Sequence, residues 1–290
     1  MTRVVVTGGS GKLGRAVVSD LAAHGYDVVN LDRLAPPPAQ PGTFLAVDLT
    51  DYGQVLGALT AVDERYLSVD AVVHLAAIPA PGLAPNAVTF ANNVLSSYHV
   101  FEAARAAGIT NVVWAASETG LGLPFDTPPP YVPVDEGYRG RPETTYSLGK
   151  AVEEEMAWHF CRWNPEASII GLRFSNVMEP GDYAAFPSYE ADPQTRKWNL
   201  WGYIDARDGA QAVRRALEHG EPGLEVFVIA NADTVMTTPS RELVEQVFPG
   251  VEVRGDVEGT QTLLSIDKAR RILGYEPQHS WRDELPGVMA

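Results

Sequence analysis

The sequence predicts an α/β fold, a doubly wound parallel sheet that is followed by a small carboxy-terminal α/β lobe. Short segments rich in Val and Ile alternate with helical patterns through the first 175 residues, as in repeated strand-helix-strand units. These segments lack an apolar-polar alternation, which is typical of strands buried on both faces. A glycine-rich run directly follows the first of them. We expect the sheet domain at residues 1–175 and the smaller lobe at 176–290, interleaved with the last sheet elements.

The strands of the sheet are expected at 3–7, 27–31, 43–47, 71–75, 111–115 and 168–172. Two helices between them have clear apolar stripes. One stripe runs from Leu13 to Leu21, and Gly25 is suited to end that helix. The other covers 94–107 and is followed by Gly108.

The rhythm becomes less regular after residue 172. Residues 178–202 are rich in Pro, Gly, Tyr and Trp and are expected to form a loop. A helix over 208–219, a strand over 225–229 and helices over 240–248 and 267–273 should follow. Three consecutive prolines at 128–130 predict another loop, between Ser117 and Tyr146, where it could face a substrate.

Composition excludes several classes of function. The 290 residues carry a formal net charge of −15, which disfavours nucleic acid and anionic membrane surfaces as partners. Cys161 is the single cysteine, so no internal disulfide can form, and we expect a reducing, cytoplasmic location. The six histidines show no metal-ligand spacing, and we expect no metal. A signal peptide or membrane span is not expected from the apolar runs.

The glycine-rich run Thr7-Gly8-Gly9-Ser10-Gly11-Lys12-Leu13-Gly14 predicts a dinucleotide site. Glycine permits a sharp turn from strand to helix and lets the backbone approach a pyrophosphate. A helix that starts near Lys12 would direct free N–H groups at that anion. The alternative is an ordinary tight turn.

Asp32 strengthens this interpretation because it ends the second strand. A carboxylate there accepts hydrogen bonds from the adenosine ribose and repels a 2′-phosphate, which favours NAD over NADP. The neighbouring Arg33 works against that preference. Asp48 and Leu49 follow the third strand and could reach the adenine, although Asp48 could equally serve a helix N-terminus. His74 is expected to be packed rather than catalytic.

The pair Tyr146 and Lys150 has the spacing of one helical turn, so both side chains face the same side. Tyrosine ionises near pH 10 in water, and an adjacent ammonium favours the phenolate. Tyr146 could then act as general base or acid, with a hydroxyl from Ser117 or Thr119 polarising the same oxygen. Such a pair also occurs by chance on exposed helices, and it gains meaning from the glycine turn, Asp32 and Ser117.

In this order the motifs resemble those of an extended short-chain dehydrogenase/reductase, of the NAD-dependent epimerase/dehydratase family. The matching pieces also include His74-Leu75-Ala76-Ala77, Asn92-Asn93-Val94, Tyr146-Ser147-Leu148-Gly149-Lys150, Leu172-Arg173-Phe174-Ser175-Asn176-Val177 and Asp205-Ala206-Arg207-Asp208. The resemblance covers nearly the whole chain.

The resemblance implies a Rossmann fold, NAD as cofactor, a homodimer, and Ser117, Tyr146 and Lys150 as catalytic residues. Cofactor contacts are expected from Gly8, Gly11, Lys12, Leu13, Gly14, Asp32, Arg33, Asp48, Leu49, Leu75, Ala76, Ala77, Asn93, Tyr146 and Lys150. Substrate contacts are expected from Ser117, Glu118, Thr119, Ser175 and Asn176.

The segment after Val177 bears on the substrate. Relatives that handle nucleotide sugars carry a longer segment there, which holds the diphosphate, whereas this one has only Arg196 and Lys197 as cations before Arg207. A free sugar or sugar acid is therefore expected. Compact uronate dehydrogenases are similar, but Ala184 stands where their carboxylate-binding arginine would be.

Surface arginines such as Arg196 could replace that cation, whereas Glu118 would repel an acid and favours a neutral sugar. Trp198, Trp201, Tyr183 and Tyr189 could stack on a sugar ring or could equally serve packing.

Three functions stay open at this point. The first is an NAD-dependent sugar dehydrogenase in sugar metabolism, the second an epimerase that retains NAD, and the third a cofactor-sensing regulator without turnover. The reaction direction and stereochemistry are not decided by the sequence.

Overall fold

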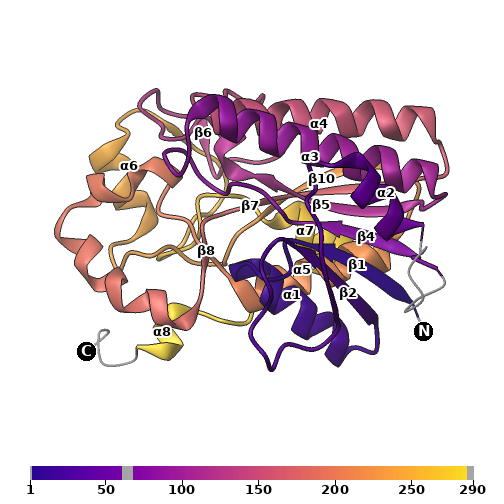
Figure 1. The fold of residues 1–290 in the computed structure, drawn as a ribbon. Helices are drawn as coiled ribbons and strands as arrows, with labels where there is room; N and C mark the ends of the chain where they lie inside the picture. Colours follow the sequence, from indigo (N-terminus) through magenta and orange to yellow (C-terminus); the bar gives the residue numbers. More distant parts are fainter. Residues whose placement is uncertain (1, 61–67, 286–290) are drawn as a thin grey trace.

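A computed structural model describes residues 2–60 and 68–285 and has a central parallel sheet of seven strands (Figure 1). Its strand order is β10-β7-β5-β4-β1-β2-β3. The strands are β1 (Arg3–Thr7), β2 (Asp27–Asp32), β3 (Thr43–Ala46), β4 (Ala71–His74), β5 (Asn111–Ser117), β7 (Ser168–Phe174) and β10 (Gly223–Ile229). Each expected strand is confirmed to within a few residues.

Helices cover both faces of the sheet, and each face has its own apolar core. One layer contains α1 (Lys12–Ala23), α5 (Ala206–His219) and α7 (Asp267–Leu273). The other contains α2 (Tyr52–Leu59), α3 (Asn86–Ala106) and α4 (Thr145–Trp163), and α3 and α4 run along the top of Figure 1. Along β1, Val4 and Val6 pack into the first core while Val5 packs into the second. This burial on both faces explains why β1 shows no apolar-polar alternation.

The strand order reverses next to β1. The chain moves from β1 to β2 and β3 on one side and then crosses to β4, β5, β7 and β10 on the other. The loops that follow β1 and β4 therefore separate at the carboxyl edge of the sheet and leave a crevice there. This edge is where a ligand site is expected in a doubly wound fold.

Short elements at the same edge form the smaller lobe, seen on the left of Figure 1. Two small sheets pair β6 (Tyr131–Val132) with β11 (Glu252–Val253) and β8 (Val177–Met178) with β9 (Ile204–Asp205). The helical elements of this part are α6 (Ser240–Val247), α8 (Trp281–Glu284) and the 3₁₀ turns η1 (Glu118–Leu121), η2 (Pro180–Ala191), η3 (Pro193–Thr195) and η4 (Lys197–Asn199).

The prediction of a loop at 178–202 is wrong, because the 3₁₀ elements η2, η3 and η4 occupy most of that segment. Tyr183, Phe186 and Trp201 are almost completely buried and fix these turns to the lobe. The Tyr183 and Phe186 rings pack at 5.2 Å between centroids. These turns are held by buried aromatic side chains that do not recur at helical spacing. The sequence therefore shows no apolar periodicity that would predict regular structure here.

The lobe and the sheet share chain segments in both directions. Strand β10 and helices α5 and α7 follow residue 175 but belong to the sheet and its helical layer. Strand β6 precedes residue 175 but belongs to the lobe. A division at residue 175 remains a proposal. No helix within residues 2–60 and 68–285 is long and apolar enough to cross a membrane.

Candidate functional site

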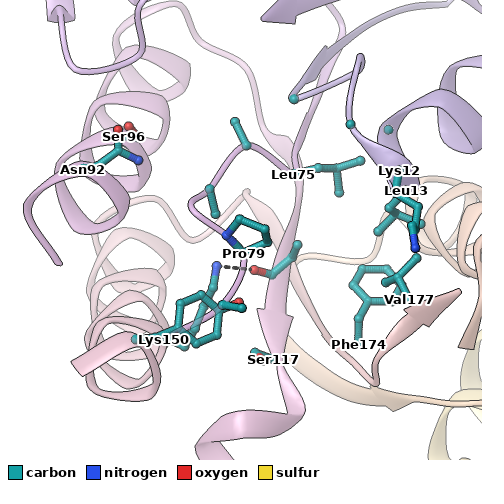
Figure 2. A pocket seen from close by; sticks show the side chains of 18 of the residues that line it. Lys12, Leu13, Leu75, Pro79, Asn92, Ser96, Ser117, Lys150, Phe174 and Val177 are labelled. Atoms are coloured by element: carbon teal, nitrogen blue, oxygen red, sulfur yellow. Dashed lines mark hydrogen bonds between the residues drawn. The ribbon is translucent and has the colours of Figure 1, made fainter. Parts of the chain in front are cut away.

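A cavity of about 720 Å³ lies at the carboxyl edge of the sheet, within the range of roughly 300–1,000 Å³ for small-molecule sites. Every residue predicted to contact cofactor or substrate lines it except Asn93. In the view of Figure 2, Lys12 and Leu13 lie on one side of the cavity and Lys150 on the other, with Ser117 near Lys150.

The glycine turn is too crowded for side chains at Gly8, Gly9 and Gly14, and a Cβ on Gly9 would lie 2.4 Å from Asn30 Oδ1. Gly8 has φ +69°, and a Cβ there would lie 2.7 Å from the backbone of Ala76. A Cβ on Gly14 would lie 2.1 Å from the Gly8 carbonyl oxygen. Gly11 differs, because its Cβ would meet only that carbonyl, at 3.3 Å. The turn thus brings β1, β4 and α1 together and leaves open backbone at Gly11.

The N-terminus of α1 is suited to an anion. Gly11 is the N-cap residue and no side chain caps the helix, so N–H groups of the first turn are left for another acceptor. Lys12 is engaged elsewhere, since its Nζ lies 2.6 Å from Asp182 Oδ2 on η2. Open backbone at Gly11 and an uncapped helix end fit the pyrophosphate of a dinucleotide.

Asp32 lies at the carboxyl end of β2 and faces the cavity. Its two carboxylate oxygens accept backbone hydrogen bonds, Oδ2 from Ser10 and Oδ1 from Leu34, each at 3.1 Å. A carboxylate accepts about four hydrogen bonds, so capacity remains for two ribose hydroxyls. Arg33 lines the cavity beside it.

Asp48 is not the N-cap of a helix. Asp51 caps α2 by accepting from the Gln54 N–H, whereas Asp48 Oδ1 accepts from the N–H and hydroxyl of Thr50. These two hydrogen bonds lower the pKa of Asp48. Asp48 and Leu49 both line the cavity, which is compatible with the expected contact to adenine.

The segment after β4 forms the wall between the glycine turn and α3. Asn93, almost fully buried on α3, holds this segment by accepting from Ile78 N at 2.8 Å and donating to Ile78 O at 3.0 Å. Asn93 therefore holds this wall of the cavity in place without lining the cavity itself. His74 is packed as expected, between the Thr7 and Ser97 hydroxyls.

Helix α4 positions Tyr146 and Lys150 from its first two turns. Thr144 caps it reciprocally: its hydroxyl accepts from Ser147 N at 3.1 Å, and Ser147 Oγ accepts from Thr144 N at 2.9 Å. Lys150 Nζ lies 6.0 Å from the centroid of the Tyr146 ring and donates to the Ala115 carbonyl, the dashed contact in Figure 2. The end of β5 brings Ser117 to the same pair.

Burial acts on the pKa of both members of this pair, but for Lys150 the neighbouring groups outweigh it. It raises the pKa of Tyr146, and the Lys150 charge and the Ser117 hydroxyl offset part of that rise. Burial alone would lower the pKa of Lys150, but the carboxylate of Glu153 and the phenol of Tyr146 raise it above its ordinary value. Lys150 is therefore a stable cation that favours the phenolate of Tyr146.

The far end of the cavity is acidic. Glu118 is almost fully buried, and burial raises its pKa to about 7 although Ser175, Asn199 and Arg196 offset part of this. Glu118 Oε2 and Ser175 Oγ lie near one another, but neither makes a hydrogen bond of good geometry within the described residues. Such groups are costly unless a ligand or water pairs with them, which suits a substrate rich in hydroxyl groups.

The expectation that Arg196 is a surface residue is wrong. It is 5% exposed, and its guanidinium stacks between the rings of Tyr189 and Trp198, at 5.2 and 4.8 Å from their centroids. It donates to the Gly202 carbonyl at 3.0 Å. Tyr183 and Trp201 are fully buried and serve packing, whereas Trp198 reaches the cavity.

Several residues that line the cavity were not predicted as contacts, namely Ser10, Leu31, Leu34, Val47, Pro79, Ala80, Pro81, Asn92, Ser96, Ala115, Ala116, Phe174 and Val177. Asn92 and Ser96 lie one helical turn apart on α3, a spacing that the sequence did display. No group of three or more His, Cys, Asp or Glu residues suited to a metal occurs among residues 2–60 and 68–285.

Comparison with known proteins gives a family match over most of the chain. Residues 4–230 match the model of the NAD dependent epimerase/dehydratase family. A putative UDP-glucose 4-epimerase of Methanocaldococcus jannaschii is 32% identical, covering 99% of this chain and 97% of that protein. A UDP-glucose 4-epimerase of Rhizobium meliloti is 27% identical, covering 95% of this chain and 92% of its own.

Solved structures share the fold. A short-chain dehydrogenase/reductase superfamily protein from Agrobacterium tumefaciens, with bound NAD, superposes with a TM-score of 0.73 at 22% identity, covering 99% of this chain and 95% of its own. A UDP-glucose 4-epimerase from Thermotoga maritima, with UDP-glucose, gives 0.72 at 22% identity, covering 98% and 96%.

Proposed function

The chain belongs to the NAD-dependent epimerase/dehydratase family, and from that premise we propose that it oxidises or reduces a hydroxyl-bearing carbon of a small sugar. NAD, held by the glycine turn and Asp32, would supply the hydride acceptor for the oxidation, and its reduced form the hydride donor for the reduction. The cavity supports the proposal because it joins a dinucleotide-type glycine turn to a buried Tyr-Lys-Ser group within one space. NADP is the less favoured cofactor because the Asp32 carboxylate would repel a 2′-phosphate.

In this proposal Tyr146 moves the substrate proton. Its phenolate accepts the proton of the sugar hydroxyl in oxidation, and its phenol donates a proton to the carbonyl oxygen in reduction. Lys150 stabilises the phenolate and has one donor left for the nicotinamide ribose, since its other donors face Ala115 O and Glu153. The Ser117 hydroxyl polarises the substrate oxygen.

The charge of the cavity wall is the observation that indicates the class of substrate. Within the described part of the chain, the cations that line the cavity are Lys12, Arg33 and Lys150, on the glycine turn, after β2 and on α4. The wall near Glu118 and Ser175 offers hydroxyl, amide and carboxyl groups instead. A nucleotide diphosphate would need cations there, so a free neutral sugar fits better.

An epimerase that retains NAD is the second candidate, because the relatives named above are UDP-glucose 4-epimerases. Tyr146 would then act twice on the same substrate oxygen, first as base and then as acid, while the hydride would leave one face of the attached carbon and return to the other. A panel of sugars, sugar acids and UDP-sugars, followed by NADH absorbance and by product isomer analysis, separates the two. NADH accumulation with a free sugar supports the dehydrogenase, and UDP-sugar isomerisation without NADH release replaces it by the epimerase.

We further propose that the chain forms a homodimer through α3 and α4. A reducing, cytoplasmic compartment is proposed as its location. The exposed apolar side chains of these helices support the dimer, among them Leu95, Tyr98, Leu148 and Trp158, each between 40% and 49% exposed. An apolar face of this kind on two adjacent helices is suited to a second copy of the chain.

A further inference from the structure

A buried glutamate lies behind the lysine of the Tyr146–Lys150 pair. Glu153 follows Lys150 by three residues on α4, and its Oε2 lies 2.9 Å from Lys150 Nζ. The exposed fractions of the two side chains are 6% for Lys150 and 1% for Glu153. A charge taken out of water costs several kcal/mol unless it is paired, so a buried acid at this position calls for an explanation.

A string of hydrogen bonds runs from the glycine turn to Ser97, whose hydroxyl lies near the Glu153 carboxyl. The Thr7 hydroxyl accepts from the N–H groups of Leu75 and Ala76, so its own proton is free for His74 Nδ1, at 2.7 Å. His74 Nε2 then carries the ring proton and donates to Ser97 Oγ, at 3.0 Å. Burial and, secondly, Lys150 lower the pKa of His74 to about 3, so the imidazole is neutral.

The direction of this string leaves the Ser97 proton available to Glu153. Ser97 Oγ accepts from His74, so the Ser97 proton is free to point at the Glu153 carboxyl. Burial raises the pKa of Glu153, while the Lys150 charge, the Lys150 hydrogen bond and the Ser97 hydroxyl lower it. The pKa of Glu153 is raised overall, and the Lys150 ammonium in contact with Oε2 is the group that favours its ionised form.

We propose that Glu153 is a positioning residue for the Tyr146–Lys150 pair: its carboxylate fixes the Lys150 ammonium, offsets part of its charge, and thereby sets the pH at which Tyr146 releases its proton. The inference rests on the proposed role of that pair in proton transfer. Glu153 itself does not touch the cavity, since it is absent from the residues that line it within the described ranges.

The sign of the effect follows from the charges around each group. Lys150 lowers the pKa of Tyr146, whereas Glu153 and Glu118 raise it. Glu153, Tyr146 and Glu154 all raise the pKa of Lys150 against burial. Loss of the Glu153 charge therefore lowers the pKa of both Tyr146 and Lys150.

The test is a tyrosinate absorbance titration of the protein saturated with NAD, which needs no sugar. Subtracting the titration of the matching Tyr146→Phe protein isolates the Tyr146 signal. We expect Glu153→Gln to move the Tyr146 midpoint down by about one pH unit. The matched control is Glu155→Gln on the same helix, 73% exposed at the side chain, which should leave the midpoint unchanged.

Three further points make the result decisive. Glu153→Asp keeps the charge and should return the midpoint toward that of the unmodified protein. Glu153→Met, of similar size and uncharged, replaces Glu153→Gln if that variant does not fold, with the same expected direction. An unchanged or higher midpoint in either uncharged variant, or an Asp variant that shifts as far as Gln, overturns the proposal. Failure of the sugar panel would leave this titration unaffected, so the two proposals fail separately.

Discussion

At the scale of single residues, the site combines groups whose ordinary chemistry is altered by burial. Tyr146 and Glu118 line the same cavity, and burial raises the pKa of each. Only Tyr146 has a buried cation one helical turn away, and this difference selects it as the group that exchanges a proton. Glu118 is instead a buried acid that is about half ionised near neutral pH.

Glu118 should make the stability of the protein depend on pH. Its pKa is about 7 in the folded state and 4.5 in the unfolded state, so its contribution is fully present below pH 4.5 and is lost as the pH rises through 7. The difference of about 2.5 units corresponds to roughly 3 kcal/mol in the free energy of unfolding. Glu118→Gln should therefore raise the free energy of unfolding more above pH 7 than it does at low pH.

Urea unfolding at pH 5 and pH 8 measures this difference. Glu155→Gln is the control, because that side chain is exposed and should show the same small effect at both pH values. Equal effects of Glu118→Gln at the two pH values would contradict a raised pKa.

Asp32 should control the choice between NAD and NADP. Asp32→Ala removes the carboxylate that would repel a 2′-phosphate, so the ratio of the two dissociation constants should shift toward NADP by about tenfold. Calorimetric titration with each cofactor measures the ratio. Because Asp32 also accepts from Ser10 N and Leu34 N, weaker binding of both cofactors is expected as well. A ratio that does not move would remove Asp32 from this role.

At the scale of elements, the capping box of α4 places the reactive tyrosine. Tyr146 lies in the first turn, where a helix frays most readily, and the reciprocal bonds of Thr144 and Ser147 hold that turn. Thr144→Ala should lower the free energy of unfolding by about 1 kcal/mol.

The same change should reduce activity more than it reduces NAD binding, because the phenol becomes less well placed while the glycine turn is untouched. Denaturant unfolding and steady-state kinetics measure the two effects. Thr144→Ser retains the hydroxyl and should restore both. Full activity in Thr144→Ala would show that the cap does not position Tyr146.

The elements also show how far sequence reasoning reaches. The strands were predictable because continuous Val and Ile segments can only be buried between two helical layers, as Val4, Val5 and Val6 are. The cofactor side of the site was predictable because glycines and Asp32 occupy fixed places relative to β1 and β2. Both predictions depend only on residues that are close together along the chain.

The substrate side escaped prediction for the opposite reason. Arg196 is buried by Tyr189 and Trp198 in turns without periodicity, and Lys12 meets Asp182 across 170 residues. Glu153 was visible three residues after Lys150, but its burial depends on Ser97 and His74 from other elements. Only the folded structure shows which of the three consecutive glutamates faces the lysine.

At the scale of the whole molecule, the proposed dimer would bury the outer face of α3 and α4. Leu148 is 49% exposed on the same helix as Tyr146, and its replacement by a charge should prevent association. We expect Leu148→Glu to be monomeric by light scattering after size exclusion, against a dimeric parent protein. Leu34→Glu is the control, since Leu34 is 74% exposed and lies outside both helices. A dimer that persists in Leu148→Glu would contradict an interface on α3 and α4.

In the proposed function, one cavity holds NAD against a tyrosine that exchanges the substrate proton. NADH absorbance with the sugar panel, for the parent protein and for Tyr146→Phe, tests it most directly. We predict that at least one sugar produces NADH with the parent protein, and that Tyr146→Phe, while still binding NAD, lowers this rate at least about a hundredfold. Undiminished NADH formation by Tyr146→Phe on the same sugar would contradict the claim.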